Sequence, residues 1–113
     1  ILLEGFGYIK ISIRLMGIDT PELRGTQKTL GIKARNYLID KLTNIVIDTD
    51  DYTRYTIRDM INKDTHMIEV LFGDFDKYGR PLAIIYKDNI NINEMLIKDG
   101  YAKEYDGGTK DTW

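Results

Sequence analysis

The sequence predicts an α+β domain built on a small β-barrel. Several short apolar runs have the length and composition of strands, and two longer segments repeat apolar residues at helical spacing. Strands and helices are mixed along the chain without strict alternation, which argues against a doubly wound sheet and favours a small barrel with packed helices. The chain has 113 residues, 42% apolar and 30% charged, which fits one globular domain.

The first predicted feature is a β-hairpin. We expect strands at residues 1–3 and 8–16, because the glycines in the connection at residues 4–7 suit a tight reversal. In the second strand the apolar side chains take the odd positions. Successive side chains of a strand point to opposite faces, so Arg14 should face away from the core.

The segment after the hairpin combines charged side chains with conformational constraints. Gly17 can turn the chain, while Pro21 fixes its own φ and biases Thr20 toward an extended conformation. Asp19 and Glu22 therefore leave the strand end in a restricted geometry. Two carboxylates beside the arginine of the preceding strand suit a metal-bound phosphate, although an ordinary turn with surface charge remains an alternative.

The middle of the chain is expected to contain one helix and three extended segments. Apolar residues recur at helical spacing from Thr29 to Leu42, which predicts an amphipathic helix. Its expected apolar face consists of Leu30, Ala34, Tyr37, Leu38 and Leu42. A short strand is predicted at residues 45–47, and further extended segments at residues 55–57 and 67–72.

The last part of the chain is expected to add a strand, a short helix and an extended end. The apolar run at residues 81–86 is short enough for a strand and follows a polar loop. Asn91 and Glu94 form an N-terminal capping pattern, and Gly100 suits the end of the same helix. Residues 101–105 are expected to be extended before a glycine-rich loop.

The composition excludes several classes of site. The chain has no cysteine and one histidine, His66, so neither a thiolate site nor a histidine-based zinc site is expected. A membrane span needs about 20 apolar residues, and no apolar run in the sequence approaches this length. No signal-peptide pattern is seen at the start of the sequence, and no membrane partner is expected. With a net charge of −2, a polyanion would need a local basic site or a bound cation.

A second charged group, DKYGR at residues 76–80, precedes the strand at residues 81–86. Gly79 permits a sharp turn, and Arg80 can project from the start of the strand. Arginine presents a planar fork of donors that matches phosphate oxygens, so Arg14 and Arg80 are better phosphate ligands than Lys77. Taken alone, a loop of this kind is more often a solvated hairpin turn than a site.

Three segments together resemble the thermonuclease family, also called staphylococcal nuclease-like domains. They are IRLMGIDTPE at residues 13–22, DKYGRPLAIIY at residues 76–86 and NINEMLIKDGYAKEY at residues 91–105, with the helical GIKARNYLIDKL between the first two. The resemblance implies one domain over residues 1–113, with a five-stranded OB-type barrel and packed helices. It also implies a calcium-dependent nuclease that hydrolyses phosphodiester bonds of DNA and RNA with little sequence specificity.

The resemblance also implies a role for each matching residue. Arg14 and Arg80 match arginines that bind the scissile phosphate, and Glu22 matches the glutamate that orients or deprotonates the attacking water. Asp19 matches a carboxylate ligand of the calcium ion, and Thr20 matches the neighbour whose main-chain carbonyl binds the same ion. The residues expected near the bound nucleotide are Lys77, Tyr78 and Tyr105.

The sequence departs from the family pattern at its start. Family members carry an Asp-Gly-Asp-Thr segment before the arginine-bearing strand, and one of its aspartates is a second calcium ligand. This chain has no such segment. Because residues 1–15 read as the hairpin itself, we expect the first barrel strand and its aspartate to lie upstream of Ile1. The domain would then be N-terminally incomplete, with an open barrel edge and a weak calcium site.

Two other functions remain open. The first is a catalytically inactive OB-type module that binds single-stranded nucleic acid or protein. The presence of Arg14, Asp19, Glu22 and Arg80 argues against it, whereas the missing upstream aspartate leaves it open. The second is a general oligonucleotide-binding barrel, which would expose aromatic and basic side chains on one face. Its candidate residues are Tyr52, Arg54 and Tyr55.

Overall fold

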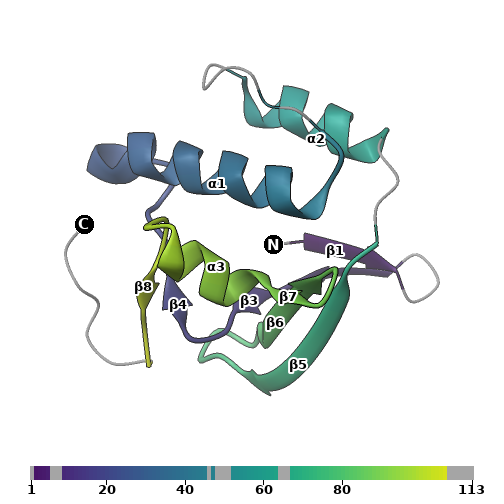
Figure 1. The fold of residues 1–113 in the computed structure, drawn as a ribbon, viewed down its shortest axis with the longest axis vertical. Helices are drawn as coiled ribbons and strands as arrows, with labels where there is room; N and C mark the ends of the chain where they lie inside the picture. The colour runs from purple at the N-terminus through teal and green to yellow at the C-terminus, as the bar shows by residue number, and fades with distance from the viewer. Residues whose placement is uncertain (1, 6–8, 46, 48–51, 64–66, 107–113) are drawn as a thin grey trace.

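The computed structural model describes residues 2–5, 9–45, 47, 52–63 and 67–106 of the chain. Within these ranges it has three α-helices, a short 3-10 helix and eight strands (Figure 1), which confirms the α+β prediction. The helices are η1 (Gly25–Gln27), α1 (Lys28–Leu42), α2 (Arg54–Asn62) and α3 (Ile92–Lys98). The strands are β1 (Leu2–Gly5), β2 (Ile9–Ser12), β3 (Arg14–Leu15), β4 (Ile18–Asp19), β5 (Glu69–Phe75), β6 (Pro81–Lys87), β7 (Ile90–Asn91) and β8 (Lys103–Glu104).

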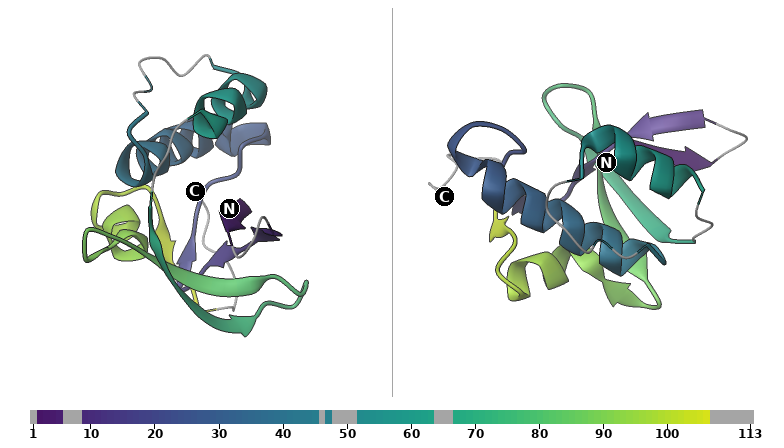
Figure 2. Two further views of the ribbon diagram at one scale, coloured as in Figure 1. Left: turned by 90° about the vertical axis from the view of Figure 1, so that its right-hand side faces the viewer. Right: turned by 90° about the horizontal axis from the view of Figure 1, so that it is seen from above.

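The described strands form three separate hydrogen-bonded sheets and do not close a barrel. β1 and β2 form the predicted antiparallel hairpin. In the largest sheet β6 lies between the antiparallel β5 and the parallel β3, and β7 also pairs with β6. β4 and β8 form a third, antiparallel pair. Figure 2 shows the long β5–β6 pair on one side of the molecule and the helices on the other.

The strand predicted at residues 8–16 is divided in two. β2 ends at Ser12 and β3 begins at Arg14, because the chain changes its partner from β1 to β6 at Ile13. Ile13 is 2% exposed, whereas Arg14 is half-buried. The predicted alternation between core and outward-facing side chains therefore holds across the break.

α1 confirms the first predicted helix, with one correction on its buried face. Ala34 and Leu42 are buried as expected. Leu30, predicted to lie on the apolar face, is instead 47% exposed. The next residue, Gly31, is buried in its place, because the main chain at Glu22 passes directly over it.

The extended segment predicted at residues 55–57 is wrong, because these residues lie in α2. The β-branched and aromatic side chains favoured a strand, but Thr53 caps a helix here. Its Oγ1 accepts a hydrogen bond from the main-chain N–H of Thr56 at 3.2 Å. Ile57 is 5% exposed, so the helix also buries an apolar side chain, which outweighs the strand propensity.

The two remaining predictions in the middle of the chain have different outcomes. The short strand predicted at residues 45–47 is wrong for the residues that the structure describes, since Ile45 and Ile47 lie outside any strand. Val46 lies outside the described residues. The extended segment predicted at residues 67–72 is confirmed as β5, although this strand continues to Phe75.

The predictions for the described residues of the last part of the chain are confirmed, whereas residues 107–109 of the predicted loop lie outside the described residues. β6 covers the apolar run at residues 81–86, and β8 lies within the extended segment at residues 101–105. Asn91 caps α3, since its Oδ1 accepts a hydrogen bond from the main-chain N–H of Glu94 at 3.1 Å. Gly100 follows the helix with a φ of 84°, a conformation that favours glycine.

Two groups of buried apolar side chains form the core between the helices and the sheets. The first consists of Ile13, Leu42, Ala83, Ile85 and Ile92, and the second of Ile18, Leu96 and Ala102. Leu15 and Leu38 pack against both groups, so the core is continuous from β6 to β4. None of the helices in the described ranges has the length and apolar character needed to cross a bilayer.

Candidate functional site

The centre of the site is the tight turn that joins β3 to β4. Gly17 has a φ of 78°, in the left-handed region, so a side chain at this position would strain the turn. The main-chain N–H of Met16 donates to the carbonyl of Ala83 at 2.8 Å, which ties the turn to β6. The turn therefore holds the end of β3, with Arg14, against the strand that follows Arg80.

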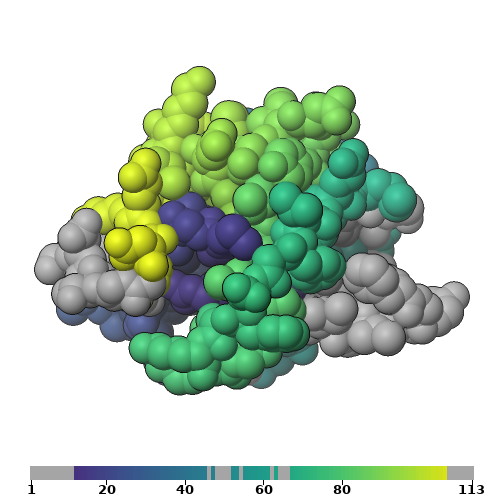
Figure 3. Space-filling model, turned by 90° about the horizontal axis from the view of Figure 1, so that it is seen from below, coloured from purple at the N-terminus to yellow at the C-terminus, as the bar shows by residue number. Residues whose placement is uncertain are grey.

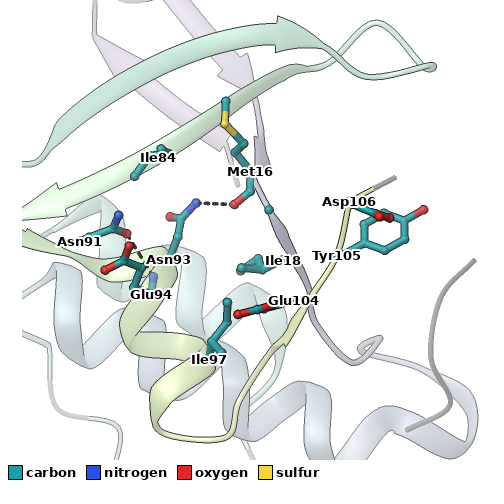
Figure 4. A pocket seen from close by; sticks show the side chains of 11 residues that line it. Met16, Ile18, Ile84, Asn91, Asn93, Glu94, Ile97, Glu104, Tyr105 and Asp106 are labelled. Carbon is teal, nitrogen blue, oxygen red and sulfur yellow. Dashed lines mark hydrogen bonds between the residues drawn. The ribbon is translucent and has the colours of Figure 1, made fainter. Parts of the chain in front are cut away.

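Asn93 supports this turn from the inside and was not recognised in the sequence as a site residue. Its side-chain Nδ2 donates to the carbonyl oxygen of Met16 at 3.0 Å (Figure 4). The same Nδ2 donates to the carbonyl oxygen of Ala83 at 3.0 Å, and the Oδ1 accepts from the N–H of Ile85 at 3.2 Å. Asn93 is 3% exposed. The available signal was a polar residue on the same helix face as the apolar Leu96, at a spacing of three residues.

Five of the eight predicted site residues line one cavity of about 490 Å³. They are Arg14, Lys77, Tyr78, Arg80 and Tyr105. Figure 3 shows this face of the molecule, where the β3–β4 segment, in dark blue, lies between β8, in yellow, and the β5–β6 hairpin, in teal. Three cationic side chains on this cavity outnumber the two carboxylates, of Asp76 and Asp106. The cavity therefore suits an anion such as a phosphate.

Asp76 organises the loop that presents Arg80, a role that sequence reasoning missed. Its Oδ1 accepts hydrogen bonds from the main-chain N–H groups of Tyr78 and Arg80, at 2.8 and 2.9 Å. Its Oδ2 accepts from the Nε of Arg80 at 2.9 Å. Gly79 completes the turn with a φ of 82°. A half-buried aspartate four residues before an arginine therefore fixes the direction of the guanidinium.

The environment of Asp76 keeps its carboxyl group ionised. Burial raises the pKa of Asp76, but hydrogen bonds from the main-chain N–H groups of Arg80 and Tyr78, and then the Arg80 guanidinium, outweigh this effect. The net result is a pKa below the ordinary value of 3.8. The side chain of Asp76 is 10% exposed and that of Arg80 is 40% exposed, so the arginine is more accessible to solvent than its anchor.

The aromatic rings of the cavity lie against its cationic side chains. The guanidinium carbon of Arg14 is 5.5 Å from the centre of the Tyr105 ring, and that of Arg80 is 5.8 Å from the centre of the Tyr78 ring. The Nζ of Lys77 is 5.4 Å from the Tyr78 ring. Cations at such distances are attracted by the ring face, so the tyrosines help to orient the basic groups.

The three predicted acidic and metal-binding residues, Asp19, Thr20 and Glu22, are not part of the lining of this cavity. Asp19 is in β4 opposite Lys103 of β8 and is 6% exposed, whereas Thr20 is exposed. The side chain of Glu22 is 63% exposed, and its Oε2 lies 3.8 Å from the Nε of Arg24. The structure thus brings the two arginines together on one cavity and leaves the predicted carboxylates of Asp19 and Glu22 off its lining.

Calcium was the expected metal, and the donors at the predicted site are of the right chemical type. The carboxylate of Asp19 and the main-chain carbonyl of Thr20 are oxygen ligands of the kind that calcium takes. Calcium takes about six to eight such oxygens. In the part of the chain that the structure describes, no three acidic or histidine side chains come close enough together to hold an ion. Asp19 and Thr20 thus offer oxygen donors of the right type, but fewer of them than a complete calcium site needs.

A second cavity, of about 610 Å³, lies on the other side of the same turn (Figure 4). It shares residues 16–18 and 105–106 with the first cavity. Its charged lining residues are all acidic, namely Glu94, Glu104 and Asp106. Carboxylates repel a phosphate, so the smaller cavity with the two arginines is the better anion site although the second is larger.

Comparisons with known proteins agree with the resemblance seen in the sequence. The family model described as staphylococcal nuclease homologue matches residues 12–112. An uncharacterised protein of Methanocaldococcus jannaschii is 32% identical over an alignment that covers 82% of this chain and 48% of the relative. A probable staphylococcal-like nuclease of Oryza sativa subsp. japonica is 28% identical, over 86% of this chain and 20% of the relative.

The chain thus spans about half the length of the archaeal relative and a fifth of the rice relative. The match to the family nevertheless includes both arginine-bearing segments and the helix between them. The chain belongs to the staphylococcal nuclease homologue family.

Proposed function

We propose that this protein is a calcium-dependent nuclease that hydrolyses phosphodiester bonds of DNA and RNA with little sequence specificity. Membership of the family supports a nuclease-type function in general. The observation that carries the proposal is that Arg14 and Arg80, far apart in the sequence, line the same cavity. An OB-type barrel, as the resemblance implies, is part of the same proposal.

In this proposal the two arginines bind the non-bridging oxygens of the scissile phosphate. Each guanidinium can offer two parallel N–H donors, and the Nε of Arg80 is already held by Asp76. These donors would stabilise the negative charge that builds on the phosphate in the transition state. Glu22, whose side chain is exposed to solvent, would orient a water for attack on the phosphate. Asp19 and Thr20 would hold the calcium ion, which would supply further positive charge.

The low sequence specificity follows from the type of side chain on the cavity. Cationic groups that bind phosphate contact the part of a nucleic acid that is the same at every position. Tyr78 is 74% exposed, so its ring is accessible for stacking on any base. Neither kind of contact distinguishes one base from another by its hydrogen-bonding edge.

The proposal is tested by nuclease assays on single-stranded DNA and RNA, in calcium and in excess chelator, with three variants. Arg80→Lys keeps the charge and removes the planar fork, so cleavage should fall by about 10² to 10³-fold. Glu22→Gln should cause a loss of similar size. Arg58→Lys is the matched control, because Arg58 is an exposed arginine on α2, and it should leave the rate unchanged. Full cleavage in chelator, or by Glu22→Gln, contradicts the mechanism.

A second function is favoured by one observation. The basic groups and tyrosines line the cavity, whereas Glu22 is not part of its lining. A module that binds single strands without cleaving them would have this arrangement. Tight binding of single-stranded DNA, measured by fluorescence anisotropy, together with no cleavage in calcium, would favour this function over the nuclease.

A further inference from the structure

A close contact holds the main chain at Glu22 against helix α1. Gly31 lies in the second turn of this helix and packs directly on the peptide that joins Glu22 to Leu23. A Cβ atom at Gly31 would lie 2.6 Å from the carbonyl carbon of Glu22 and 3.0 Å from the main-chain nitrogen of Leu23. Both atoms belong to the main chain, so a side chain at Gly31 would displace the whole segment.

A second contact holds the same residue from the other side. The main-chain N–H of Glu22 donates to the side-chain Oε1 of Gln27, in η1, at 3.0 Å. The preceding Pro21 is buried, which anchors the segment to the core. Helix α1 and the short helix before it therefore fix the main chain at Glu22, while the Glu22 carboxylate itself stays at the surface.

These contacts matter because an exposed side chain is not placed by packing around it. The position of the Glu22 carboxylate relative to the cavity depends on where its Cα is held. A displacement of about 1 Å in a catalytic group can lower a rate by about 10²-fold. We infer that Gly31 and Gln27 are positioning residues, which hold the main chain of Glu22 where its carboxylate can serve the site. This inference rests on the proposed nuclease function.

The first experiment is a double-mutant cycle in the nuclease assay with single-stranded DNA. Gly31→Ala should lower kcat by about 10²-fold with KM unchanged, because the methyl group displaces Glu22 and not the phosphate ligands. In the Glu22→Gln background the same substitution should cause little further loss, since the carboxylate that it displaces is already absent. Thr29→Ala, at an exposed position of the same helix, is the control and should change neither constant.

A second pair of variants keeps the inference testable if Gly31→Ala does not fold. Gln27→Met has a similar length but no oxygen to accept from the Glu22 N–H, so it should lower kcat. Gln27→Glu keeps that oxygen and should restore most of the rate. Amide hydrogen exchange gives a readout that does not depend on catalysis. The Glu22 N–H should exchange faster in Gln27→Met than in the parent protein and Gln27→Glu.

The results separate the two proposals. If Glu22→Gln keeps full activity, the proposed role of Glu22 is wrong, and the inference fails with it. If Glu22→Gln loses activity but Gly31→Ala and Gln27→Met do not, the nuclease proposal stands and the positioning role is wrong. Additive losses in the double mutant, or unchanged exchange of the Glu22 amide, would equally overturn the positioning role.

Discussion

Replacing Asn93 with leucine should lower the free energy of unfolding by about 2 to 6 kcal/mol. Leucine matches asparagine in the number and branching of its side-chain heavy atoms and is bulkier, so the change removes the hydrogen bonds without opening a cavity. It leaves the N–H of Ile85 without an acceptor and the carbonyl of Met16 without its donor. Each such buried group costs about 1 to 3 kcal/mol. The carbonyl of Ala83 still accepts from the N–H of Met16, so it adds little to the loss.

Asn93→Asp tests the acceptor oxygen and the donor nitrogen of the amide separately, because it keeps the oxygen and replaces the nitrogen. Its carboxylate can still accept from the N–H of Ile85, but it meets the carbonyl oxygens of Met16 and Ala83, which the amide Nδ2 contacts at 3.0 Å. At neutral pH this variant should be destabilised by repulsion between the oxygens. The loss should shrink as the pH is lowered, because a protonated carboxyl group can donate to one of the two carbonyls.

Both variants are measured by urea denaturation followed by far-ultraviolet circular dichroism. Asn91→Asp is the matched control on the same helix, because aspartate caps a helix about as well as asparagine does, and it should change stability by less than about 0.5 kcal/mol. The reasoning is refuted if Asn93→Leu lowers the free energy of unfolding by less than about 1 kcal/mol while the slope of that free energy against urea concentration is unchanged. The hydrogen bonds of Asn93 would then not secure the turn.

Three further predictions concern the cavity and the packing of α1. Tyr105→Leu should weaken binding of a mononucleotide about two- to fivefold by calorimetry, because the ring under Arg14 is lost, whereas Tyr105→Phe should not. Asp76→Asn should lower kcat/KM about fivefold to tenfold, since the charged anchor of the arginine loop is removed. Burial, and then the hydrogen bond to Asp99, raises the pKa of Tyr37 in the folded protein. The stability that Tyr37 contributes is therefore fully present below the ordinary pKa of 10.0, and it is lost as the pH rises through the raised pKa. Urea denaturation above pH 10 should show this decline in the parent protein and not in Tyr37→Phe.

The parts of the fold that were predicted correctly are those determined by residues close together in the sequence. The cap of α3 depends on Asn91 and Glu94, which are three residues apart, and the strand β6 is a continuous apolar run. Helix α2 was missed although its cap, Thr53, is equally local. There the strand propensity of its β-branched and aromatic residues predicted an extended segment, and the cap together with the burial of Ile57 decides for the helix.

In the candidate site, too, some features could be predicted from the sequence and others could not. The types of side chain on the cavity were predictable, because a phosphate site needs forked cations and the resemblance placed Arg14 and Arg80. The residues that hold the site together were not. Asn93 contacts Met16 across 77 positions of the chain, and Gly31 is recognisable only when the main chain at Glu22 is seen to pass over it. Such contacts depend on tertiary packing between segments far apart in the chain, so no local sequence pattern reveals them.

The meeting of the two arginines depends on the register of one short parallel pairing. β3 pairs with β6 so that Arg14 lies opposite Leu82, two residues after Arg80. A shift of one residue in this pairing would turn the side chain of Arg14 to the opposite face of the sheet, toward the core. β3 itself contributes only Arg14 and Leu15 to the pairing, so its own hydrogen bonds specify the register weakly. Contacts beyond β3 secure the register. The N–H of Met16 donates to the carbonyl of Ala83, and the side chain of Asn93 donates to the carbonyl oxygens of Met16 and Ala83. The side chain of Asn93, which does not line the cavity of the two arginines, therefore helps to hold that cavity together.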